Sequence, residues 1–249
     1  MITLKTREEI ELMRAANVMV AEILEILRGL VRPGINTMAL EQRAEEETRK
    51  RGVKAAFKGY YGFPWCLCAS LNNVVVHGMP SEDTVLKEGD ILGMDFGVLY
   101  KGFYGDSAIT VPVGEISVPA RRLLDVTAAS LERAIEAARP DKTLGDIAAA
   151  VQGYVEAEGF SVVRDFVGHG IGKELHEPPQ VPNFGRAGSG LRLEPGMVLA
   201  IEPMINQGGY KTRVLEDGWT AVTVDGALSA HFEHTVAITE DGPYVLSRL

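Results

Sequence analysis

Two acidic residues end apolar segments at positions where a buried strand is expected to stay hydrophobic. Asp95 ends the segment 86–95 and Glu202 ends the segment 193–202, and these segments match at a constant offset of 107 residues. In each segment a turn at a glycine precedes a short apolar strand. A buried carboxylate is costly unless a positive group lies beside it, so the doubled pattern requires a cationic partner at both positions.

A third carboxylate, Asp106, is predicted to lie beside Asp95. The chain between them has the pattern of a β-hairpin that turns within Tyr100–Gly102. A turn centred on 100–101 places Asp95 directly across from Asp106, with their Cβ atoms about 5 Å apart.

Glu233 is the fourth carboxylate of the set. A turn centred on Asp217–Gly218, a strong hairpin signal, places Glu202 across from Glu233, and bulges are expected in this longer hairpin. If the two halves share one sheet, all four carboxylates gather in one place. Like charges this close repel or become protonated unless cations neutralise them. Two divalent ions balance the four negative charges and leave room for a bridging hydroxide.

His169 lies in the glycine-rich segment Gly168–Gly172, where a ligand can approach the chain closely. Oxygen-rich ligands with one imidazole suit Mn, Fe, Co or Zn better than Mg alone. Two such ions about 3.5–4 Å apart generate hydroxide at neutral pH and clamp a tetrahedral intermediate. A phosphate-binding loop is a weaker interpretation, because the segment lacks the Lys-Ser/Thr ending of a Walker motif and the spacing of a Rossmann fingerprint.

The elements that must position these residues also repeat. Amphipathic spacing and capping residues predict four helices, over 7–29, 36–51, 119–138 and 143–158. Three further pairs of residues share the offset of 107: Pro33 with Pro140, Leu40 with Ile147, and Gly52 with Gly159. We therefore expect an α+β fold in a single domain, 1–249, made of two pseudo-twofold-related halves at roughly 7–113 and 118–249.

The segment 55–76 is rich in glycine and aromatic residues, including Phe57, Tyr60, Phe63 and Trp65. One interpretation is a surface loop that packs on itself. The other is the wall of a pocket, since large rigid side chains on loops suit binding.

Composition and net charge limit the kinds of molecule that this chain is expected to bind. A net charge of -9 over 249 residues argues against nucleic acid and against an anionic membrane surface. The two cysteines, Cys66 and Cys68, are too close to bridge readily, which indicates a reduced protein. We found no signal-peptide pattern, no membrane span and no dimerisation stripe, so we expect a cytoplasmic monomer.

These motifs resemble those of the type I, bacterial-type methionine aminopeptidases. The matching motifs are Asp95 with Asp106, Gly168–Gly172, Leu175–Glu177, Ile201–Met204 and Glu233–Thr235. The resemblance implies the pita-bread fold, in which helices cover a curved, mainly antiparallel sheet. It also implies a dinuclear metal centre with five ligands: Asp95, Asp106, His169, Glu202 and Glu233.

The same resemblance implies roles for further residues. His77 would contact the scissile amide nitrogen, His176 would donate to the developing oxyanion, and Glu202 would move a proton from the bridging water to the leaving amine. The methionine pocket would comprise Tyr60, Phe63, Cys68, His77, Leu175, His176 and Trp219. A monovalent-cation site would involve Asn72, Val74 and Ser229.

The implied activity is hydrolytic removal of N-terminal methionine from nascent chains whose second residue is small, with a ribosome contact as a further implication. An Xaa-Pro-specific aminopeptidase of the same fold is an alternative, but such enzymes usually carry a separate N-terminal domain, and 94 residues precede Asp95 here. A non-catalytic binding protein is a second alternative, disfavoured because all five ligands are present.

Four residues depart from the pattern of the family. Phe63, Leu175, Val167 and His231 stand where Tyr, Phe, Cys and Gln are common. None of them is a metal ligand, so these departures bear on the shape of the pocket.

Overall fold

The computed structural model describes residues 2–249. Four long helices form where amphipathic spacing predicts them: α1 (Arg7–Arg28), α2 (Thr37–Lys50), α3 (Val118–Ala137) and α4 (Leu144–Ala157). The side chains of Thr6, Asn36, Ser117 and Thr143 each accept a hydrogen bond from the first turn, which explains why the helices begin there. The four predicted helices are confirmed.

A nine-stranded antiparallel sheet forms the centre of the fold. Its main path runs β1 (Lys54–Ala55), β4 (Ile91–Tyr100), β5 (Phe103–Pro112), β14 (Glu233–Thr239), β9 (Val198–Ile201), β7 (Gly168–Gly170) and β8 (Glu177–Val181). Two more strands join at the side, β2 (Leu67–Leu71) on β4 and β15 (Gly242–Val245) on β14. A one-turn 3-10 helix covers Tyr60–Gly62.

Two small three-stranded sheets complete the fold. One contains β13 (Ser229–His231), β10 (Met204–Asn206) and β6 (Ser161–Val162). The other contains β11 (Thr212–Val214), β12 (Ala221–Thr223) and β3 (Val74–Val76).

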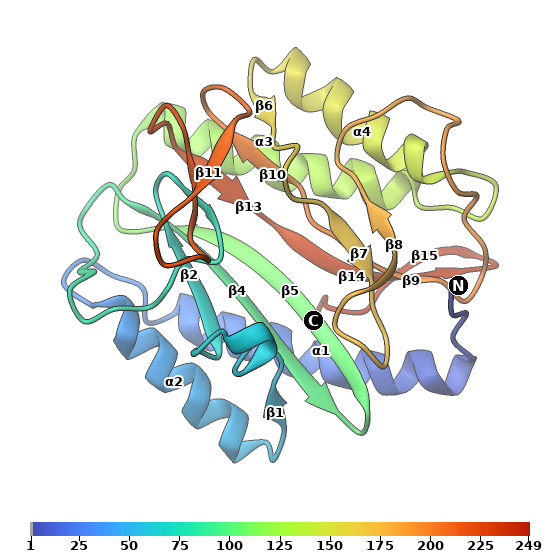
Figure 1. The fold of residues 1–249 in the computed structure, drawn as a ribbon, viewed down its shortest axis with the longest axis horizontal. Helices are drawn as coiled ribbons and strands as arrows, with labels where there is room; N and C mark the ends of the chain where they lie inside the picture. Colours follow the sequence, from blue (N-terminus) through green and yellow to red (C-terminus); the bar gives the residue numbers. More distant parts are fainter. Residues whose placement is uncertain (1) are drawn as a thin grey trace.

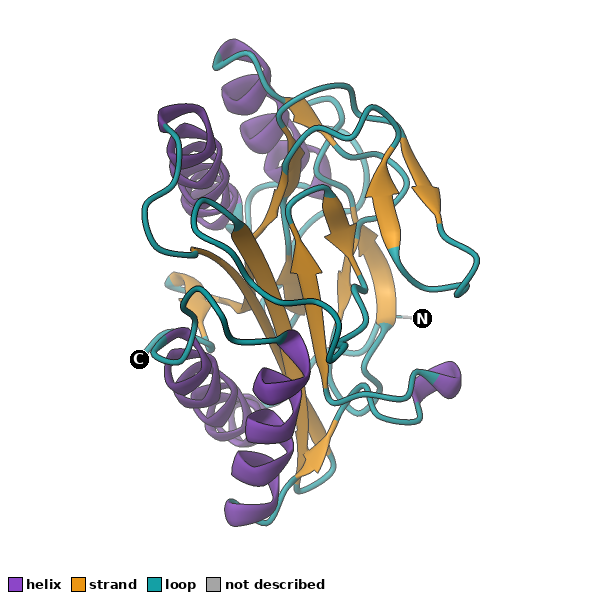
Figure 2. Ribbon diagram, turned by 90° about the vertical axis from the view of Figure 1, so that its left-hand side faces the viewer, coloured by secondary structure: helices purple, strands orange, loops and turns teal. Residues whose placement is uncertain are grey.

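The four long helices cover one side of the large sheet, and most of the long loops lie on the other (Figure 2). Figure 1 shows α1 and α2 grouped beneath β4 and β5, whereas α3 and α4 lie together at the opposite end of the molecule. Each helix pair has its own core, the first including Leu24, Leu40 and Phe96. The second includes Ile147 and Ile201. Within residues 2–249, no helix has both the length and the apolar character needed to cross a membrane.

Matching contacts recur in the two halves at the offset of 107 residues. The isolated bridge between Asn36 and Val85 has its counterpart between Thr143 and Arg192. The hydrogen bond from Leu86 N to Ile35 O (2.8 Å) is repeated from Leu193 N to Lys142 O (2.9 Å). The sequence repeat therefore corresponds to repeated local structure, which supports the division into two related halves.

The predicted register of the first hairpin is wrong. Asp95 pairs with Ala108, and Asp106 pairs with Gly97, so the two carboxylates are diagonal neighbours. The turn is Lys101–Gly102, one residue further along the chain than predicted, and both residues have positive φ (49° and 84°). Two residues of positive φ make the tight turn whose twist matches the flanking strands, and this turn sets the register.

The second hairpin is more regular than expected. His234 pairs with Ile201, Met204 with His231, and Thr212 with Thr223, which is one unbroken register along the hairpin. The bulges expected in this hairpin are absent from these pairings. The turn lies at Asp217–Gly218 as predicted, where the carboxylate of Asp217 accepts hydrogen bonds from Trp219 N and Thr220 N.

Candidate metal centre and substrate pocket

A cavity of about 510 Å³ opens among the strands and loops. Every residue predicted as a metal ligand lines it: Asp95, Asp106, His169, Glu202 and Glu233. Every residue predicted for the methionine pocket lines it as well: Tyr60, Phe63, Cys68, His77, Leu175, His176 and Trp219. The structure therefore brings both predicted groups together in one place.

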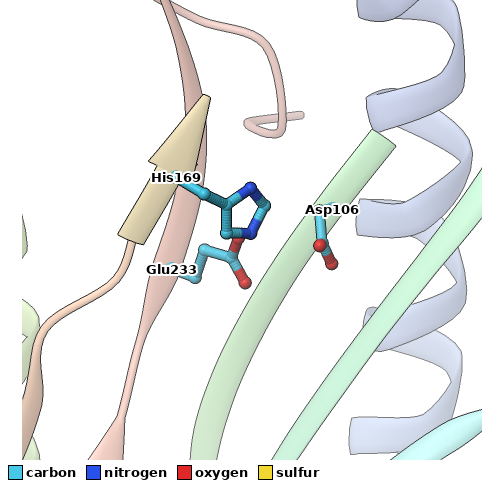
Figure 3. Close-up of side chains that lie close together, drawn as sticks. All are labelled: Asp106, His169 and Glu233. Carbon is cyan, nitrogen blue, oxygen red and sulfur yellow. The ribbon is translucent and has the colours of Figure 1, made fainter. Parts of the chain in front are cut away.

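Asp106, His169 and Glu233 converge from three strands, β5, β7 and β14 (Figure 3). One ligand atom from each lies within 4.8 Å of the other two. The sheet brings them together because β5 and β14 pair where the two halves meet, with Glu233 opposite Ala108. Residues from different halves of the repeat thus contribute to one site.

Glu202 lies next to this triad. Its Oε1 is 3.6 Å from Nε2 of His169, and its Oε2 is 3.5 Å from Nε2 of His231. His169 Nδ1 lies 3.0 Å from the carbonyl oxygen of Gly170, which can only accept, so Nδ1 carries the proton. The Nε2 lone pair therefore faces the carboxylates, as a metal-ligating histidine requires.

The residues of the cavity fit bound divalent metal ions. Three buried carboxylate oxygens, from Asp95, Asp106 and Glu233, have no hydrogen-bond partner in the described structure. Burial raises the pKa of Asp95 to about 7 and that of Glu202 to about 8, and it also raises the pKa values of Asp106 and Glu233. Such a cluster can be ionised at neutral pH only with cations bound.

The imidazole of His169 completes the donor set. Burial lowers the pKa of His169 to about 3, so the ring stays neutral and its lone pair stays available. A neutral imidazole among four carboxylates matches the mixed N and O donors that Mn, Fe, Co and Zn accept.

Packing against the helices determines which face of β5 carries the ligand. A Cβ at Gly105 would lie 2.8 Å from backbone atoms of Ala16 and Asn17 in α1, so this residue faces the helix. Side chains alternate along a strand, which turns Asp106 to the opposite face. The Asn17 side chain also accepts a hydrogen bond from Asp106 N at 3.2 Å.

Three hydroxyl side chains form hydrogen bonds with the backbone at or near the predicted ligands. Ser107 Oγ donates to Glu233 O (2.7 Å), and Thr235 Oγ1 donates to Asp106 O (2.8 Å). Thr110 Oγ1 accepts from His231 N and donates to His231 O. The sequence carried no signal for these contacts, because each joins residues more than 120 positions apart.

Aromatic rings and histidines form the outer wall of the cavity. Phe63 packs edge-to-face on Trp219 with ring centroids 5.2 Å apart, and His77 lies 6.3 Å from the same tryptophan ring. His176 Nδ1 lies 2.9 Å from the hydroxyl of Tyr60, and the His176 ring is 4.3 Å from that of His169. The pocket-wall interpretation of the segment 55–76 is thus correct for its lining residues.

Two histidines at the site have unusual settings. His77 has a positive φ of 58°, a strained conformation for a non-glycine residue. Burial lowers the pKa of His77 to about 4 and keeps it neutral. His231 is 4% exposed, and its Nε2 has no hydrogen-bond partner among the described residues.

Some lining residues were not predicted. Phe166, Gln180 and Met204 line the cavity from the second half, and Val76 lines it from the first. Phe166 contacts the His77 ring at 5.7 Å. Apolar and amide side chains are common in any chain, so the sequence does not distinguish these residues. They are recognised only because the fold brings their loops together around the cavity.

The residues predicted for a monovalent cation also lie near one another. Ser229 N donates to the carbonyl oxygen of Asn72 at 2.9 Å, and β13, which contains Ser229, contacts β3, which contains Val74. Their role in binding a cation stays a prediction.

Comparison with known proteins identifies the family. A model of metallopeptidase family M24 matches residues 11–240. The chain belongs to metallopeptidase family M24. Among its M24 relatives, a methionine aminopeptidase of Clostridium perfringens is 54% identical, with 99% of each chain covered. This confirms the resemblance to the methionine aminopeptidases.

Solved structures of M24 enzymes confirm the fold. A methionine aminopeptidase from Thermotoga maritima superposes with a TM-score of 0.98 at 48% identity, over 100% of each chain. The pita-bread architecture is therefore correct. An Xaa-Pro dipeptidase from Bacillus anthracis shares the M24 fold at a TM-score of 0.78 and 24% identity, and this chain covers 62% of it.

Proposed function

We propose that the protein removes N-terminal methionine by hydrolysis from peptides and nascent chains whose second residue is small. The observation that carries the proposal is the cavity itself, which combines five metal-binding side chains with an apolar, aromatic wall. Two relatives that are 54% and 48% identical to this chain are methionine aminopeptidases, which further supports it.

The donor set supports two divalent ions, drawn from Co, Mn, Fe or Zn, held by Asp95, Asp106, His169, Glu202 and Glu233. When bound, such ions lower the pKa of water so that a nucleophile forms near pH 7, and they polarise the scissile carbonyl. The protein's contribution is to fix the ligands before the substrate arrives, through strand register and hydroxyl contacts.

Glu202 is the proposed proton carrier. Its carboxylate stands at the edge of the ligand cluster with one oxygen toward His169 and the other toward His231. Asn183 Nδ2 donates to the Glu202 carbonyl at 2.9 Å and fixes the backbone. From this position Glu202 takes a proton from the attacking water and delivers it to the leaving amine.

His176 and His77 are proposed to act on the substrate directly. A Tyr60 hydroxyl that donates to Nδ1 of His176 leaves the proton on Nε2, where it can be donated to a developing oxyanion. His77 lies near Trp219 and, being neutral, can form a hydrogen bond to the scissile nitrogen.

The apolar wall suits an unbranched thioether side chain. Phe63, Cys68 and Leu175 are buried, at 3%, 4% and 1% exposure. Burial raises the pKa of the Cys68 thiol well above its ordinary value, so this side chain serves as a small apolar surface.

The proposed setting follows from the same family. We place the protein in the cytoplasm as a monomeric single domain, 1–249, acting on nascent chains near the ribosome. A monovalent cation at Asn72, Val74 and Ser229 would brace the loop before His77.

A peptide panel tests the activity. Purified protein is supplied with Mn, Fe, Co or Zn and mixed with Met-Gly, Met-Ala, Met-Leu and Ala-Pro peptides. We expect methionine release from the first two, much slower release from Met-Leu and no cleavage of Ala-Pro. Failure to cleave Met-Gly and Met-Ala with every metal would reject the proposal, and preferential cleavage of Ala-Pro would favour the Xaa-Pro alternative.

A further inference from the structure

Lys5 and Glu177 form a nearly buried ion pair beside the cavity. Lys5 Nζ lies 2.5 Å from Glu177 Oε2, and the two side chains are 3% and 10% exposed. Lys5 belongs to the segment that precedes α1, whereas Glu177 begins β8 and lines the cavity. The pair therefore connects the first residues of the chain to the rim of the metal site.

The other carboxylate oxygen of Glu177 holds the loop 172–176. Oε1 accepts hydrogen bonds from Lys173 N at 2.8 Å and from Glu174 N at 3.3 Å. This loop joins β7 to β8 and presents Leu175 and His176 to the cavity. One side chain thus binds the loop with one oxygen and the N-terminal segment with the other.

Lys5 is fixed from several sides. Its Nζ donates to Thr3 O at 3.0 Å, and its backbone N–H donates to Gly196 O at 2.7 Å. Its Cε packs so closely on Gly172 that a Cβ there would lie 2.5 Å away. The ammonium cannot easily move out to water, so removing either partner leaves an uncompensated buried charge.

An exposed ion pair on the same loop provides a contrast. Lys173 Nζ lies 3.2 Å from Glu9 Oε1, but the Lys173 side chain is 66% exposed. Pairs of this kind contribute little, because water and salt screen them. Both are Lys–Glu ion pairs at the loop 172–176, but only the Lys5–Glu177 pair is buried.

We propose that the Lys5–Glu177 ion pair is a positioning device that holds the loop 172–176, and with it His176 and Leu175, in place for the substrate. The roles of His176 and Leu175 rest on the proposed function, whereas the placement of the loop can be measured without it. The pair makes the N-terminal segment a part of the active-site structure.

The test compares four variants with the wild-type protein, all loaded with Mn²⁺. Lys5→Met keeps the aliphatic stem and removes the charge, and Glu177→Gln keeps an oxygen for the two loop amides. The double variant removes both charges, and Lys173→Met is the matched control. Hydrogen exchange of the amides in 172–176, kcat and KM for Met-Ala cleavage, and Mn²⁺ affinity are measured.

Each single variant is expected to lower kcat/KM by about ten- to a hundredfold, since a displacement of about 1 Å at an active site has effects of this size. Exchange in 172–176 should rise by about tenfold while exchange in β4 and β5 stays unchanged. The double variant should recover part of kcat/KM, because no unpaired charge remains. For Lys173→Met, kcat/KM should stay within about twofold of the wild-type value. The affinity for Mn²⁺ should be unchanged in all four variants.

Unchanged exchange in 172–176 and unchanged kcat/KM in both single variants would overturn the proposal. A rise in exchange throughout the chain would also overturn it, because the pair would then support the fold as a whole. If Lys5→Met does not fold, Glu177→Gln and the double variant decide the question. If the wild-type protein releases no methionine, the proposed function fails, and the exchange data still decide whether the pair holds the loop.

Discussion

Nε2 of His169 lies 3.6 Å from Oε1 of Glu202, and both atoms present lone pairs to the space between them. Such an arrangement is repulsive unless a proton or a cation lies between the two groups. The unpartnered oxygens of Asp106 and Glu233 point to the same conclusion. The site is thus built for bound cations, and its behaviour without them should reveal this.

Metal-free protein should lose stability as pH rises from 6.5 to 8. Asp95 and Glu202 have pKa values of about 7 and 8 in the folded state, raised from 3.8 and 4.5 by burial. The folded state keeps protons that the unfolded state releases, so the stabilisation is complete below the ordinary values and is lost as pH rises through the folded ones.

The buried histidines do not compensate in this window. The pKa of His169 is lowered to about 3, so its stabilising contribution is complete above 6.5 and is lost only on acidification. Thermal melts with chelator and with Mn²⁺ check the prediction: Tm should fall across the window without metal and change less with it. A metal-free Tm that is level or rising between pH 6.5 and 8 would contradict it.

His176→Ala should lower kcat by about 10²–10³-fold with a smaller change in KM, because an oxyanion donor acts mainly in the transition state. Steady-state kinetics on Met-Ala peptide measure both constants. Glu174→Ala is the control, since this exposed residue shares the loop. Equal kinetics for the two variants would remove His176 from the chemistry.

His231→Leu should lower kcat/KM by about tenfold, and His231→Gln should stay near wild type. Nε2 of His231 lies 3.5 Å from Glu202 Oε2 without a hydrogen bond between them, so a protonated Nε2 would place a weakly attracting donor beside that carboxylate. Glutamine offers a donor of similar reach, whereas leucine offers none. Full activity in His231→Leu would show that the contact has no influence on Glu202.

Gly105→Ala should lower the free energy of unfolding by roughly 1–3 kcal/mol, because the new methyl group would press on the α1 backbone, 2.8 Å away. Gly153→Ala is the matched control, since nothing lies within 4 Å of its Cβ position in α4. That change should raise the free energy by about 0.5–1 kcal/mol. Urea titration measures both, and equal effects would contradict the assigned packing of Gly105.

Local signals in the sequence predict much of this fold. The helices follow from apolar spacing and from caps such as Thr6 and Thr143, which act within one turn. The offset of 107 residues links Asp95 to Glu202 through the order of residues alone. Four carboxylates at matched positions in apolar strands predict a metal centre, although one such residue alone would not.

Contacts distant in sequence could not be predicted in the same way. The register between Asp95 and Asp106 depends on a backbone choice at Lys101–Gly102 that several turns would satisfy. The pairing of Lys5 with Glu177 spans 172 positions and depends on how loops converge. Charged residues of both kinds are abundant in the chain, so no pattern distinguishes this pair from an exposed one.

The most direct test of the metal centre is anomalous diffraction from crystals of the Mn-loaded protein, recorded on both sides of the metal absorption edge. We predict two anomalous peaks about 3.5–4 Å apart, enclosed by Asp95, Asp106, His169, Glu202 and Glu233. No peak among these five side chains, with the metal found elsewhere or absent at saturating concentration, would contradict the account.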